Sequence, residues 1–345
     1  MKILHSSPAF LPHVGGLELN VANIAEHLQR AGHEVTVVTR TPGAAPDRFP
    51  FRVVRRPSPR ELLQWTRWCD IFFQANVSLR GLWPLLLVRR PWAVSHHSWY
   101  CRTDGRIAWQ DRLKRYLLRY AAVSIAVSQA VANDLAVPSV VIPNPYRDRL
   151  FRFLPGVERS GELVFVGRLV SDKGVDILLN ALGMLAGEGL EPRLTVIGDG
   201  PEAPRLRQQA RLLGLTDRVD FQGALTGEAL VEALNRHRIL VAPSRYNEPF
   251  GIVALEGIAC GCVVVGSGGG GLAEAIGRCG RTFRNGDAAD LARVLADVLR
   301  HPANDGEYLR HAREHLALHG AERVAAAYSR VLTEAARKGE RRAAA

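Results

Sequence analysis

Two glutamates separated by seven residues bound the segment EPFGIVALE, Glu248 to Glu256. Pro249 suits the first turn of a helix, which would leave the backbone N–H groups of Phe250 and Gly251 free at the positive end of a helix dipole. Such an end favours an anionic diphosphate. Glu248 would precede this helix and Glu256 would lie about two turns inside it, so one carboxylate could bind sugar hydroxyls and the other ribose hydroxyls. The segment alone fits equally well an ordinary N-terminal acid followed by a solvated helix glutamate.

Two basic side chains in a loop could neutralise that diphosphate. The loop from Gly167 to Gly174 reads GRLVSDKG, follows an apolar strand and precedes a helix. Arg168 and Lys173 therefore stand at a strand-to-helix turn, where phosphates bind in folds with alternating strands and helices. A second loop, GDGP at 198–201, follows the next strand.

These loops belong to a regular alternation of strands and helices. We predict strands at 2–5, 34–39, 70–74, 92–95, 124–127 and 140–142, and then at 163–166, 193–197, 219–222, 239–242 and 263–266, with helices that include 17–31 and 175–186. This alternation specifies an α/β fold with a doubly wound parallel sheet in each half. A length of 345 residues also suits two domains. We expect a first domain at 1–150, a second at 151–320 and a C-terminal helix at 321–345 that could pack back on the first domain and ends in a basic tail.

Charge is distributed unevenly along the chain. The net charge of +11 arises in residues 1–156, which hold 21 Lys and Arg against 10 Asp and Glu, whereas residues 157–345 hold 24 of each kind. The first half could therefore meet an anionic partner or simply carry a solubilising surface. Its richest segment, Arg102 to Tyr120, combines basic side chains with the apolar stripe Leu113, Tyr116, Leu117 and Tyr120, which suits either packing on the sheet or peripheral contact with an anionic membrane.

Location and redox state can also be anticipated. The N-terminus has no apolar region of the length that a signal peptide needs, and no apolar run approaches the ~20 residues that span a bilayer. The five cysteines form no C-x-x-C ladder. We expect a cytoplasmic protein with reduced cysteines, with peripheral placement at the inner face of the membrane as a further hypothesis.

Several segments taken together resemble a known family. In chain order, GRLVSDKGVDILLNAL, LTVIGDGPE, VDFQGAL, APSRYNEPFGIVALEGIACG and GGLAEAI resemble the donor domain of family 4 glycosyltransferases, and PHVGGLELNVANIAEHLQRAGHEVTVVT resembles the first βαβ unit of that family. The likeness covers nearly the whole chain. It implies the GT-B fold, in which two Rossmann-like domains face each other across a cleft, with acceptor binding by the first domain and nucleotide-sugar binding by the second.

The resemblance also implies roles for individual residues. Arg168 and Lys173 would neutralise the leaving diphosphate, Glu248 would orient the transferred sugar and Glu256 would bind the ribose. Backbone contacts with sugar and phosphate would come from Phe250, Gly251 and Ile252, and Gly16 would let the first domain approach the donor phosphates.

A histidine at the end of the strand at 92–95 would face the sugar in this family. His96 and His97 both stand there, and His97 matches the pattern better because Ser98 and a turn follow it. Asn144 matches a Pro-Asn-Gly turn near the hinge that we expect between the two domains, at 143–161, although Pro145 replaces the glycine. Gly257 and Cys262 depart from the usual alanine and proline at two packing positions.

Family members retain the anomeric configuration without an established covalent protein nucleophile. The resemblance therefore implies transfer of a hexose from a nucleoside diphosphate, UDP rather than GDP, to a saccharide, lipid-linked or other small acceptor. The leaving phosphate would accept the proton of the acceptor while the protein supplies positioning and charge. No D-x-D metal motif is present, so we expect a metal-independent enzyme without a cofactor.

Two other functions stay open, and a third is not expected. A catalytically inactive GT-B protein could bind without transfer. The segment GSGGGG at 266–271, with Asp287 about twenty positions on, matches the dinucleotide motif of an NAD-dependent oxidoreductase, although 288–299 is predicted to be helical where that motif requires a strand. A nucleic-acid partner rests on charge alone, without a recognition motif, and we do not expect one.

Overall fold

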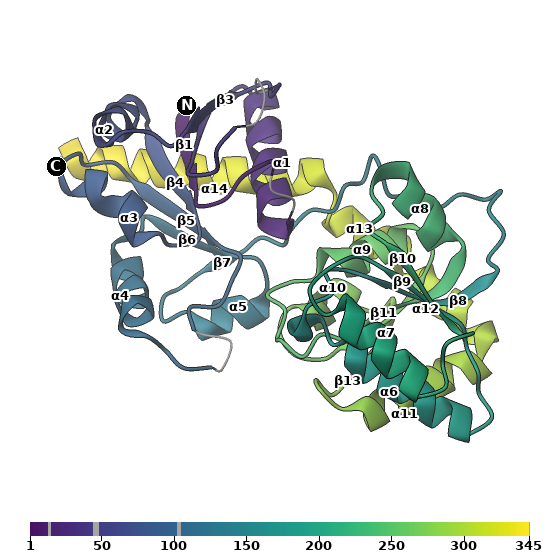
Figure 1. The fold of residues 1–345 in the computed structure, drawn as a ribbon. Coiled ribbons are helices and arrows are strands. Elements are labelled where there is room, and N and C mark those ends of the chain that lie inside the picture. The colour runs from purple at the N-terminus through teal and green to yellow at the C-terminus, as the bar shows by residue number, and fades with distance from the viewer. Residues whose placement is uncertain (13–14, 44–47, 102–104, 345) are drawn as a thin grey trace. The chain divides into compact units, whose positions relative to one another are not determined.

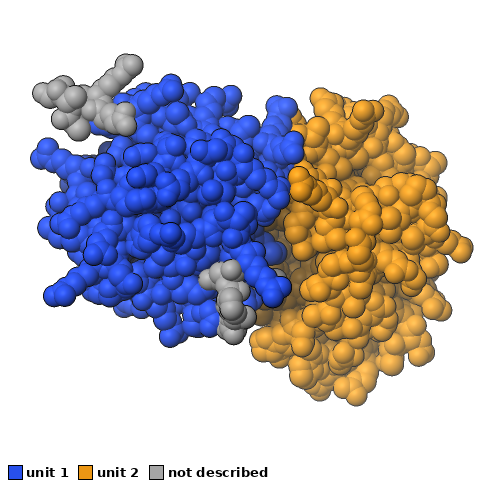
Figure 2. Space-filling model, turned by 90° about the horizontal axis from the view of Figure 1, so that it is seen from above, with its two compact units in different colours: residues 1–145, 321–345 blue, residues 146–320 orange. Residues whose placement is uncertain are grey.

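A computed structural model describes residues 1–12, 15–43, 48–101 and 105–344, with side chains as far as 339. The chain divides into two compact units, Met1–Pro145 with Ala321–Ala345, and Tyr146–Gly320, which are coloured separately in Figure 2. The first unit thus ends at Pro145 rather than at residue 150 and includes the C-terminal helix. Each unit is described below by itself.

The first unit contains a seven-stranded parallel sheet in the order β3-β2-β1-β4-β5-β6-β7 (Figure 1). The strands are β1 Lys2–Ser7, β2 Glu34–Thr39, β3 Arg52–Arg55, β4 Ile71–Ala75, β5 Trp92–His96, β6 Val123–Ala126 and β7 Val140–Val141. The chain winds outward from β1 through β2 to β3 and then returns to β4 on the other side of β1. Ligands in such sheets bind outside the carboxyl ends of the strands at the point where the strand order reverses, which here lies between β1 and β4.

Helices cover this sheet, and one of them comes from the far end of the chain. They are α1 Gly16–Arg30, α2 Pro59–Trp68, α3 Leu79–Leu82, α4 Trp109–Leu117, α5 Gln129–Asp134 and α14 Ala321–Ala344, with 3₁₀ turns η1 Trp83–Leu86 and η2 Leu118–Tyr120. Tyr328 and Leu332 of α14 are fully buried in the same hydrophobic cluster as Ile3 and Phe73 of the sheet. Helix α14 is therefore part of the core of the first unit.

The second unit contains a six-stranded parallel sheet in the order β10-β9-β8-β11-β12-β13. Its strands are β8 Gly161–Val166, β9 Leu194–Ile197, β10 Val219–Gly223, β11 His237–Ala242, β12 Val263–Ser267 and β13 Gly280–Phe283. Its helices are α6 Val175–Gly187, α7 Ala203–Leu212, α8 Gly227–Asn235, α9 Ile252–Ala259, α10 Leu272–Ile276, α11 Ala288–Arg300, α12 Asp305–Arg310 and α13 Ala312–Leu318, with 3₁₀ turns η3 Ser171–Lys173 and η4 Pro302–Asn304.

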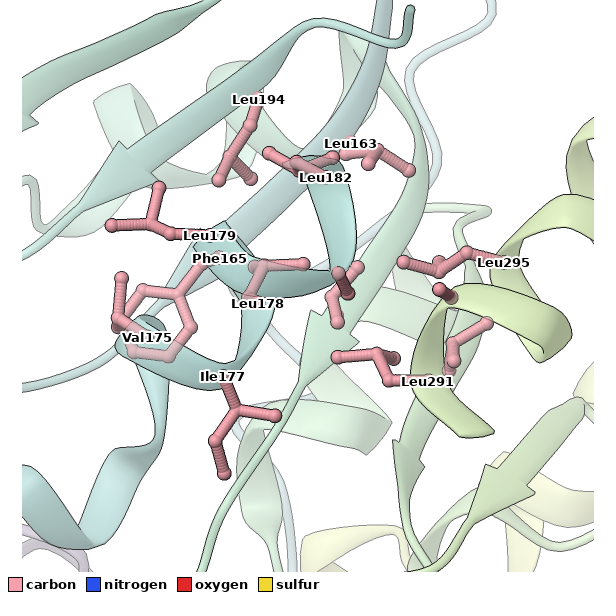
Figure 3. Close-up of a cluster of buried hydrophobic side chains, with 14 of the residues drawn as sticks. Leu163, Phe165, Val175, Ile177, Leu178, Leu179, Leu182, Leu194, Leu291 and Leu295 are labelled. Atoms are coloured by element: carbon pink, nitrogen blue, oxygen red, sulfur yellow. The ribbon is translucent and has the colours of Figure 1, made fainter. Parts of the chain in front are cut away.

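A leucine-rich core holds α6 and α11 against this sheet. Figure 3 shows Leu178 and Leu182 of α6 among Leu163 and Phe165 of β8, with Leu291 and Leu295 of α11 nearby. All six side chains are buried. Strand β8 is apolar on both faces, as expected for a strand covered by helices on both sides.

The predicted strands are present, and two further strands were missed. Strand β3 reads RVVR and β13 reads GRTF. Both lie at the edge of a sheet, where side chains need not be apolar, so neither stands out as a buried parallel strand. No helix in the described part of the chain is long and apolar enough to cross a bilayer.

Candidate active site

Two loops at one edge of the second sheet place a lysine against a glutamate. Strands β8 and β11 are parallel neighbours, so their carboxyl ends lie at the same edge. The Lys173 ammonium donates to Glu248 Oε1 at 2.6 Å, and the Ser244 hydroxyl donates to the same oxygen at 2.7 Å. The Lys173 side chain is 31% exposed and that of Glu248 16%, which leaves both reachable from solvent.

Backbone contacts fix the loop that carries Lys173. Gly174 has a left-handed conformation with φ of 67°, and a Cβ atom there would come within 2.0 Å of the Pro243 carbonyl oxygen. The Arg245 N–H donates to the Asp172 carbonyl at 2.9 Å, and the Arg245 guanidinium pairs with the carboxylate of Asp176. The two loops are therefore held together independently of the Lys173–Glu248 contact.

Arg168 lies in the same loop and has a different environment. Its side chain is exposed. Within the described residues, its guanidinium has no hydrogen bond or ion pair, and only its carbonyl is used, as an acceptor from the Val170 N–H at 3.0 Å. The structure thus supplies a free guanidinium beside a paired ammonium, an arrangement suited to two phosphate groups.

The helix after Glu248 begins later than predicted. Helix α9 starts at Ile252 with Gly251 as its N-cap, so Pro249 precedes the helix and the expectation that it forms the first turn is wrong. Gly251 has φ of 114°, a conformation that an L-residue rarely adopts, and this turn delays the helix. Among the described residues, the N–H groups of Gly251, Ile252 and Val253 have no acceptor, as expected for a helix N-terminus open to an anion.

Glu256 lies just past the first turn of α9, not two turns inside it as predicted. Its carboxylate is largely buried and lies 3.3 Å from the Arg147 guanidinium. Burial raises the pKa of Glu256 to about 7, and Arg147 opposes this rise. Near neutral pH, Glu256 therefore has comparable populations of its protonated and ionised forms.

Phe250 and Gly257 position α9. The Phe250 ring is buried with its centroid 5.7 Å from that of His319, so only the Phe250 backbone is available to a ligand. A Cβ atom on Gly257 would lie 2.6 Å from Leu240 Cδ2. The glycine that departs from the family pattern therefore allows α9 to lie close against β11.

A polar cluster that follows β11, β12 and β13 was not predicted from the sequence. The Asn285 amide donates to Asn247 Oδ1 at 3.0 Å and accepts from the Gly269 N–H at 2.7 Å. These residues lie far apart in the chain, and no spacing connects them. Arg147, which is 109 positions from Glu256, was missed for the same reason. Ser244 was missed although it stands only four positions before Glu248. Helix α11 follows at Ala288, where the dinucleotide motif would require a strand, which argues against the oxidoreductase reading.

In the first unit, His97 lies directly after β5. Its N–H donates to Asn76 Oδ1 at 2.7 Å, its Nε2 is 2.8 Å from the Ser95 hydroxyl, and its Nδ1 is 3.2 Å from the amide nitrogen of Asn20. The Asn20 amide also donates to Asn144 Oδ1 at 2.7 Å. Because the Asn20 amide nitrogen can only donate, His97 Nδ1 accepts and Nε2 carries the proton.

The two adjacent histidines differ in burial. His96 is fully buried, with Nδ1 2.6 Å from the Tyr100 hydroxyl and Nε2 2.9 Å from the Ser124 hydroxyl. His97 is half-buried. Burial lowers the pKa of His97 to about 4 and that of His96 to about 3, so both are neutral at physiological pH.

Gly16 is the first residue of α1 and is exposed, with no atom of the described residues within 4 Å of the position that its Cβ would take. Packing within the first unit therefore does not require glycine at this position. His13 and Val14 of the preceding loop lie outside the described residues, as do Arg102 to Asp104 of the basic segment. Over the described ranges, no three His, Cys, Asp or Glu side chains gather closely enough to hold a metal ion.

Two family models match consecutive parts of the chain. The model described as Glycosyltransferase Family 4 matches residues 14–148, and that described as Glycosyl transferases group 1 matches residues 147–315. Together with the two wound sheets, these matches define a nucleotide-sugar-dependent glycosyltransferase with the GT-B fold. The chain belongs to the family 4 glycosyltransferases.

Curated relatives of known name carry the same class of activity. Glycogen synthase of Mycobacterium tuberculosis is 29% identical over 99% of this chain and 96% of its own length. The 2-deoxystreptamine N-acetyl-D-glucosaminyltransferase of Streptomyces fradiae is 27% identical over 85% of this chain and 84% of its own. D-inositol 3-phosphate glycosyltransferase 2 of Catenulispora acidiphila is 35% identical over 55% of this chain and 50% of its own.

Solved structures share the fold. HepE of Anabaena, solved in complex with UDP, has a TM-score of 0.84 at 22% identity over 97% of this chain and all of its own. WaaG, a glycosyltransferase involved in lipopolysaccharide biosynthesis, has a TM-score of 0.70 at 20% identity over 96% of this chain and 99% of its own.

Proposed function

We propose that this enzyme transfers a hexose from UDP to a saccharide or lipid-linked acceptor with retention of the anomeric configuration. The observation that carries the proposal is the joint placement of Arg168, Lys173 and Glu248 in two strand-to-helix loops that are fixed to each other by backbone contacts. The choice of UDP is supported by the HepE structures, which contain UDP and UDP-glucose.

Charge stabilisation is the main catalytic contribution that these residues can make. Arg168 and Lys173 bind the diphosphate and stabilise the negative charge that grows on it as the glycosidic bond breaks. Glu248 Oε1 is occupied by Lys173 and Ser244. Its Oε2 has no hydrogen bond to any described residue and accepts from a hydroxyl of the transferred sugar.

The nucleoside is held beside α9. The carboxylate of Glu256 accepts hydrogen bonds from the ribose hydroxyls, and donor binding therefore favours its ionised form. The N–H groups of Gly251 and Ile252 donate to the diphosphate, and the buried Phe250 ring keeps this turn in place.

Retention follows from attack on the face from which the phosphate leaves. The leaving phosphate oxygen accepts the proton of the acceptor hydroxyl, so the chain needs no covalent nucleophile, metal ion or cofactor. Neutral His97 serves as a hydrogen-bond partner rather than an acid. The His97 Nδ1 contacts Asn20 and its Nε2 contacts Ser95. His97 must therefore exchange one of these partners to bind the sugar.

A surface of the first unit supports a second proposal, peripheral binding to an anionic membrane. In and beside α4, the side chains of Trp109, Tyr116 and Tyr120 are 68%, 48% and 66% exposed. Arg112 and Arg119 are exposed beside them. Exposed aromatic and basic side chains on one short helix suit the interface of an anionic bilayer, so the protein would act at the inner face of the membrane.

Not every basic residue of α4 is available for this contact. The Arg115 guanidinium donates to the carboxylate of Asp134 at 2.6 Å, and Lys114 pairs with Asp111 at 3.0 Å. The proposal is tested by vesicle sedimentation of the double variant Arg112→Ser with Arg119→Ser. The control is the double variant Arg323→Ser with Arg330→Ser on α14. Loss of sedimentation with phosphatidylglycerol vesicles in the first pair alone supports the proposal, and equal sedimentation with neutral and anionic vesicles contradicts it.

The proposed reaction is tested by a thermal-shift screen with UDP, GDP and their sugars, followed by NMR of the product. Ligand binding raises the melting temperature by mass action. We expect stabilisation by UDP above GDP, and an α-linked product from an α-linked donor with no effect of EDTA. A β-linked product contradicts retention. UDP binding without transfer to any acceptor or donor hydrolysis favours the inactive binding protein.

A further inference from the structure

A pocket of about 490 Å³ opens within the first unit, and His97 is not among its lining residues. Its lining comes from the carboxyl ends of β1, β2 and β3, from the start of α2, and from the segment after β4. This is the point at which the strand order reverses between β1 and β4, where doubly wound sheets bind ligands. The volume lies within the range of ~300–1,000 Å³ of small-molecule sites.

The charge of this pocket is strongly positive. Arg40, Arg56 and Arg80 line it, and all three are exposed. The described lining residues include no Asp or Glu. The carboxylate of Glu61, beside the lining residue Leu62, already accepts from the N–H of Ser58 at 2.8 Å. Among the described lining residues, the arginines therefore face the pocket without a carboxylate, and the nearby Glu61 carboxylate is directed to the Ser58 N–H.

The guanidinium groups are available to a ligand. Within the described residues, no hydrogen bond or ion pair occupies the guanidinium of Arg40 or Arg80. Among the described residues, Arg56 uses only its Nε, which donates to the Arg40 carbonyl at 3.3 Å, so its terminal N–H groups are also open. Three guanidiniums with open N–H groups around one pocket are the donor set that a phosphate group prefers.

The backbone at Arg56 supports a binding role. Arg56 has φ of 49°, and its N–H donates to the Thr39 carbonyl at 2.7 Å. This left-handed conformation is unfavourable for a side chain other than Gly, Asn or Asp, and such conformations concentrate at ligand sites. An arginine therefore occupies this backbone position at the pocket, although asparagine or glycine would adopt the left-handed conformation at a lower free-energy cost.

The remaining lining suits a hydroxylated ring. The side chains of Ser6 and Ser78 contribute hydroxyls, and Trp83 contributes a half-buried aromatic ring. The Ser7 hydroxyl donates to the Ala9 carbonyl at 2.6 Å and can only accept from a ligand. Beneath Gly81 lies the amide of Gln74, which is fully buried and whose Oε1 has no hydrogen-bond partner among the residues that the structure describes. Hydroxyls and an aromatic ring beside an arginine cluster match a compound that joins a polyhydroxylated ring to a phosphate.

We propose that this pocket binds the phosphate group of the acceptor, and that the acceptor is a sugar or cyclitol bearing a phosphate. The proposal rests on the proposed glycosyltransferase function and assigns the class of acceptor. Arg40, Arg56 and Arg80 hold the phosphate, while Trp83 and the serine hydroxyls contact the ring.

The phosphate could belong to a soluble sugar phosphate or to a lipid headgroup, and the experiment separates these sources. Inorganic phosphate, glucose 6-phosphate and glucose are titrated while the indole N–H signal of Trp83, assigned with Trp83→Phe, is followed by NMR. Phosphatidylglycerol vesicles form a separate sedimentation arm. The test variant is Arg40→Ser with Arg80→Ser, and the matched control is Arg323→Ser with Arg330→Ser, which removes two charges from the same unit.

We expect glucose 6-phosphate to shift the Trp83 signal and to bind at least about tenfold more tightly than glucose, and the test variant to lose about tenfold or more in affinity. The control pair should match the wild type. Dependence of vesicle binding on Arg40 and Arg80 assigns the phosphate to a lipid, and its absence assigns a soluble acceptor. The proposal is wrong if the test and control variants weaken binding equally, or if no phosphate probe depends on Arg40 and Arg80 at up to about 10 mM.

UDP binding to the same variants separates this proposal from the reaction itself. UDP is assigned to the second unit, so its thermal shift should be unchanged in the Arg40 and Arg80 variant. Failure of UDP to bind the wild type overturns the proposed function and leaves a phosphate pocket. Full transfer activity in the pocket variant, with unchanged acceptor affinity, overturns the pocket alone.

Discussion

The Lys173 ammonium donates to Glu248 Oε1 at 2.6 Å, which joins two loops separated by 75 positions in the chain. The pair holds a lysine where a diphosphate would approach, and holds a carboxylate with one oxygen still open. Neither residue alone provides both features.

Removing either partner should impair catalysis. We expect Lys173→Ala, Glu248→Gln or Arg168→Ala each to lower turnover by ~10²-fold or more, the scale of a lost transition-state contact. Arg211→Ala, an exposed arginine at the end of α7, serves as control and should match the wild type. Steady-state rates of transfer and of donor hydrolysis provide the measurement, and near wild-type rates in all three variants refute the assignment.

The contact also predicts coupling within the pair. The double variant Lys173→Ala with Glu248→Gln should lose less than the product of the two single losses, because each single change already disrupts the shared contact. If the double variant instead loses the full product of the two single losses, the two residues act independently of each other.

Two left-handed glycines make a matched comparison for the loop that carries Lys173. Gly174 and Gly189 have φ of 67° and 74°, but an added Cβ meets the Pro243 carbonyl only at Gly174, and nothing lies within 4 Å at Gly189. Gly189→Ala should cost about 1 kcal/mol from backbone strain, whereas Gly174→Ala should cost more and weaken UDP binding. Urea denaturation and UDP titration provide the test, and equal effects of the two changes argue against a fixed loop.

Stability should depend on pH through Glu256. Burial raises the folded-state pKa of Glu256 from 4.5 to about 7. Between these values the folded chain holds a proton that the unfolded chain has released, so the free energy of unfolding falls as pH rises, by about 3 kcal/mol at most. Glu256→Gln cannot titrate and should lack this slope when urea denaturation is compared at pH 5 and pH 8. Parallel pH profiles for the two proteins would show that Glu256 titrates normally.

The buried contact between Tyr100 and His96 should support the first unit. The Tyr100 hydroxyl accepts from the Val77 N–H at 3.0 Å and lies 2.6 Å from His96 Nδ1. Tyr100→Phe leaves two buried polar groups without a partner and should cost about 1–3 kcal/mol. Tyr116→Phe, at an exposed position, should cost almost nothing. A similar small cost for both variants, measured by urea denaturation, would contradict this assignment.

The fold was predictable because buried parallel strands leave a simple pattern. Segments such as Glu34–Thr39 and Val263–Ser267 are apolar and β-branched and are followed by polar loops. Strand β3 was missed because arginines flank its two valines.

The candidate site could be proposed from the sequence only where each residue stands in a local motif. Lys173 and Glu248 were proposed from their own loops, but Arg147, which reaches Glu256 from 109 positions away, could not be. The start of α9 was misplaced because Pro249 satisfies the rule for a first turn, whereas the left-handed backbone of Gly251 decides where the helix begins. The arginines of the pocket come from three separate segments, so no local sequence pattern predicts that they lie together.

Helix α14 has a consequence for how the chain is made. Because Tyr328 and Leu332 complete the cluster around Ile3 and Phe73, the first unit to leave the ribosome is the last to close. Residues 146–320 can finish folding while the sheet of the first unit still exposes the apolar face that α14 later covers. Nascent chains arrested before residue 321 should therefore need a holding chaperone.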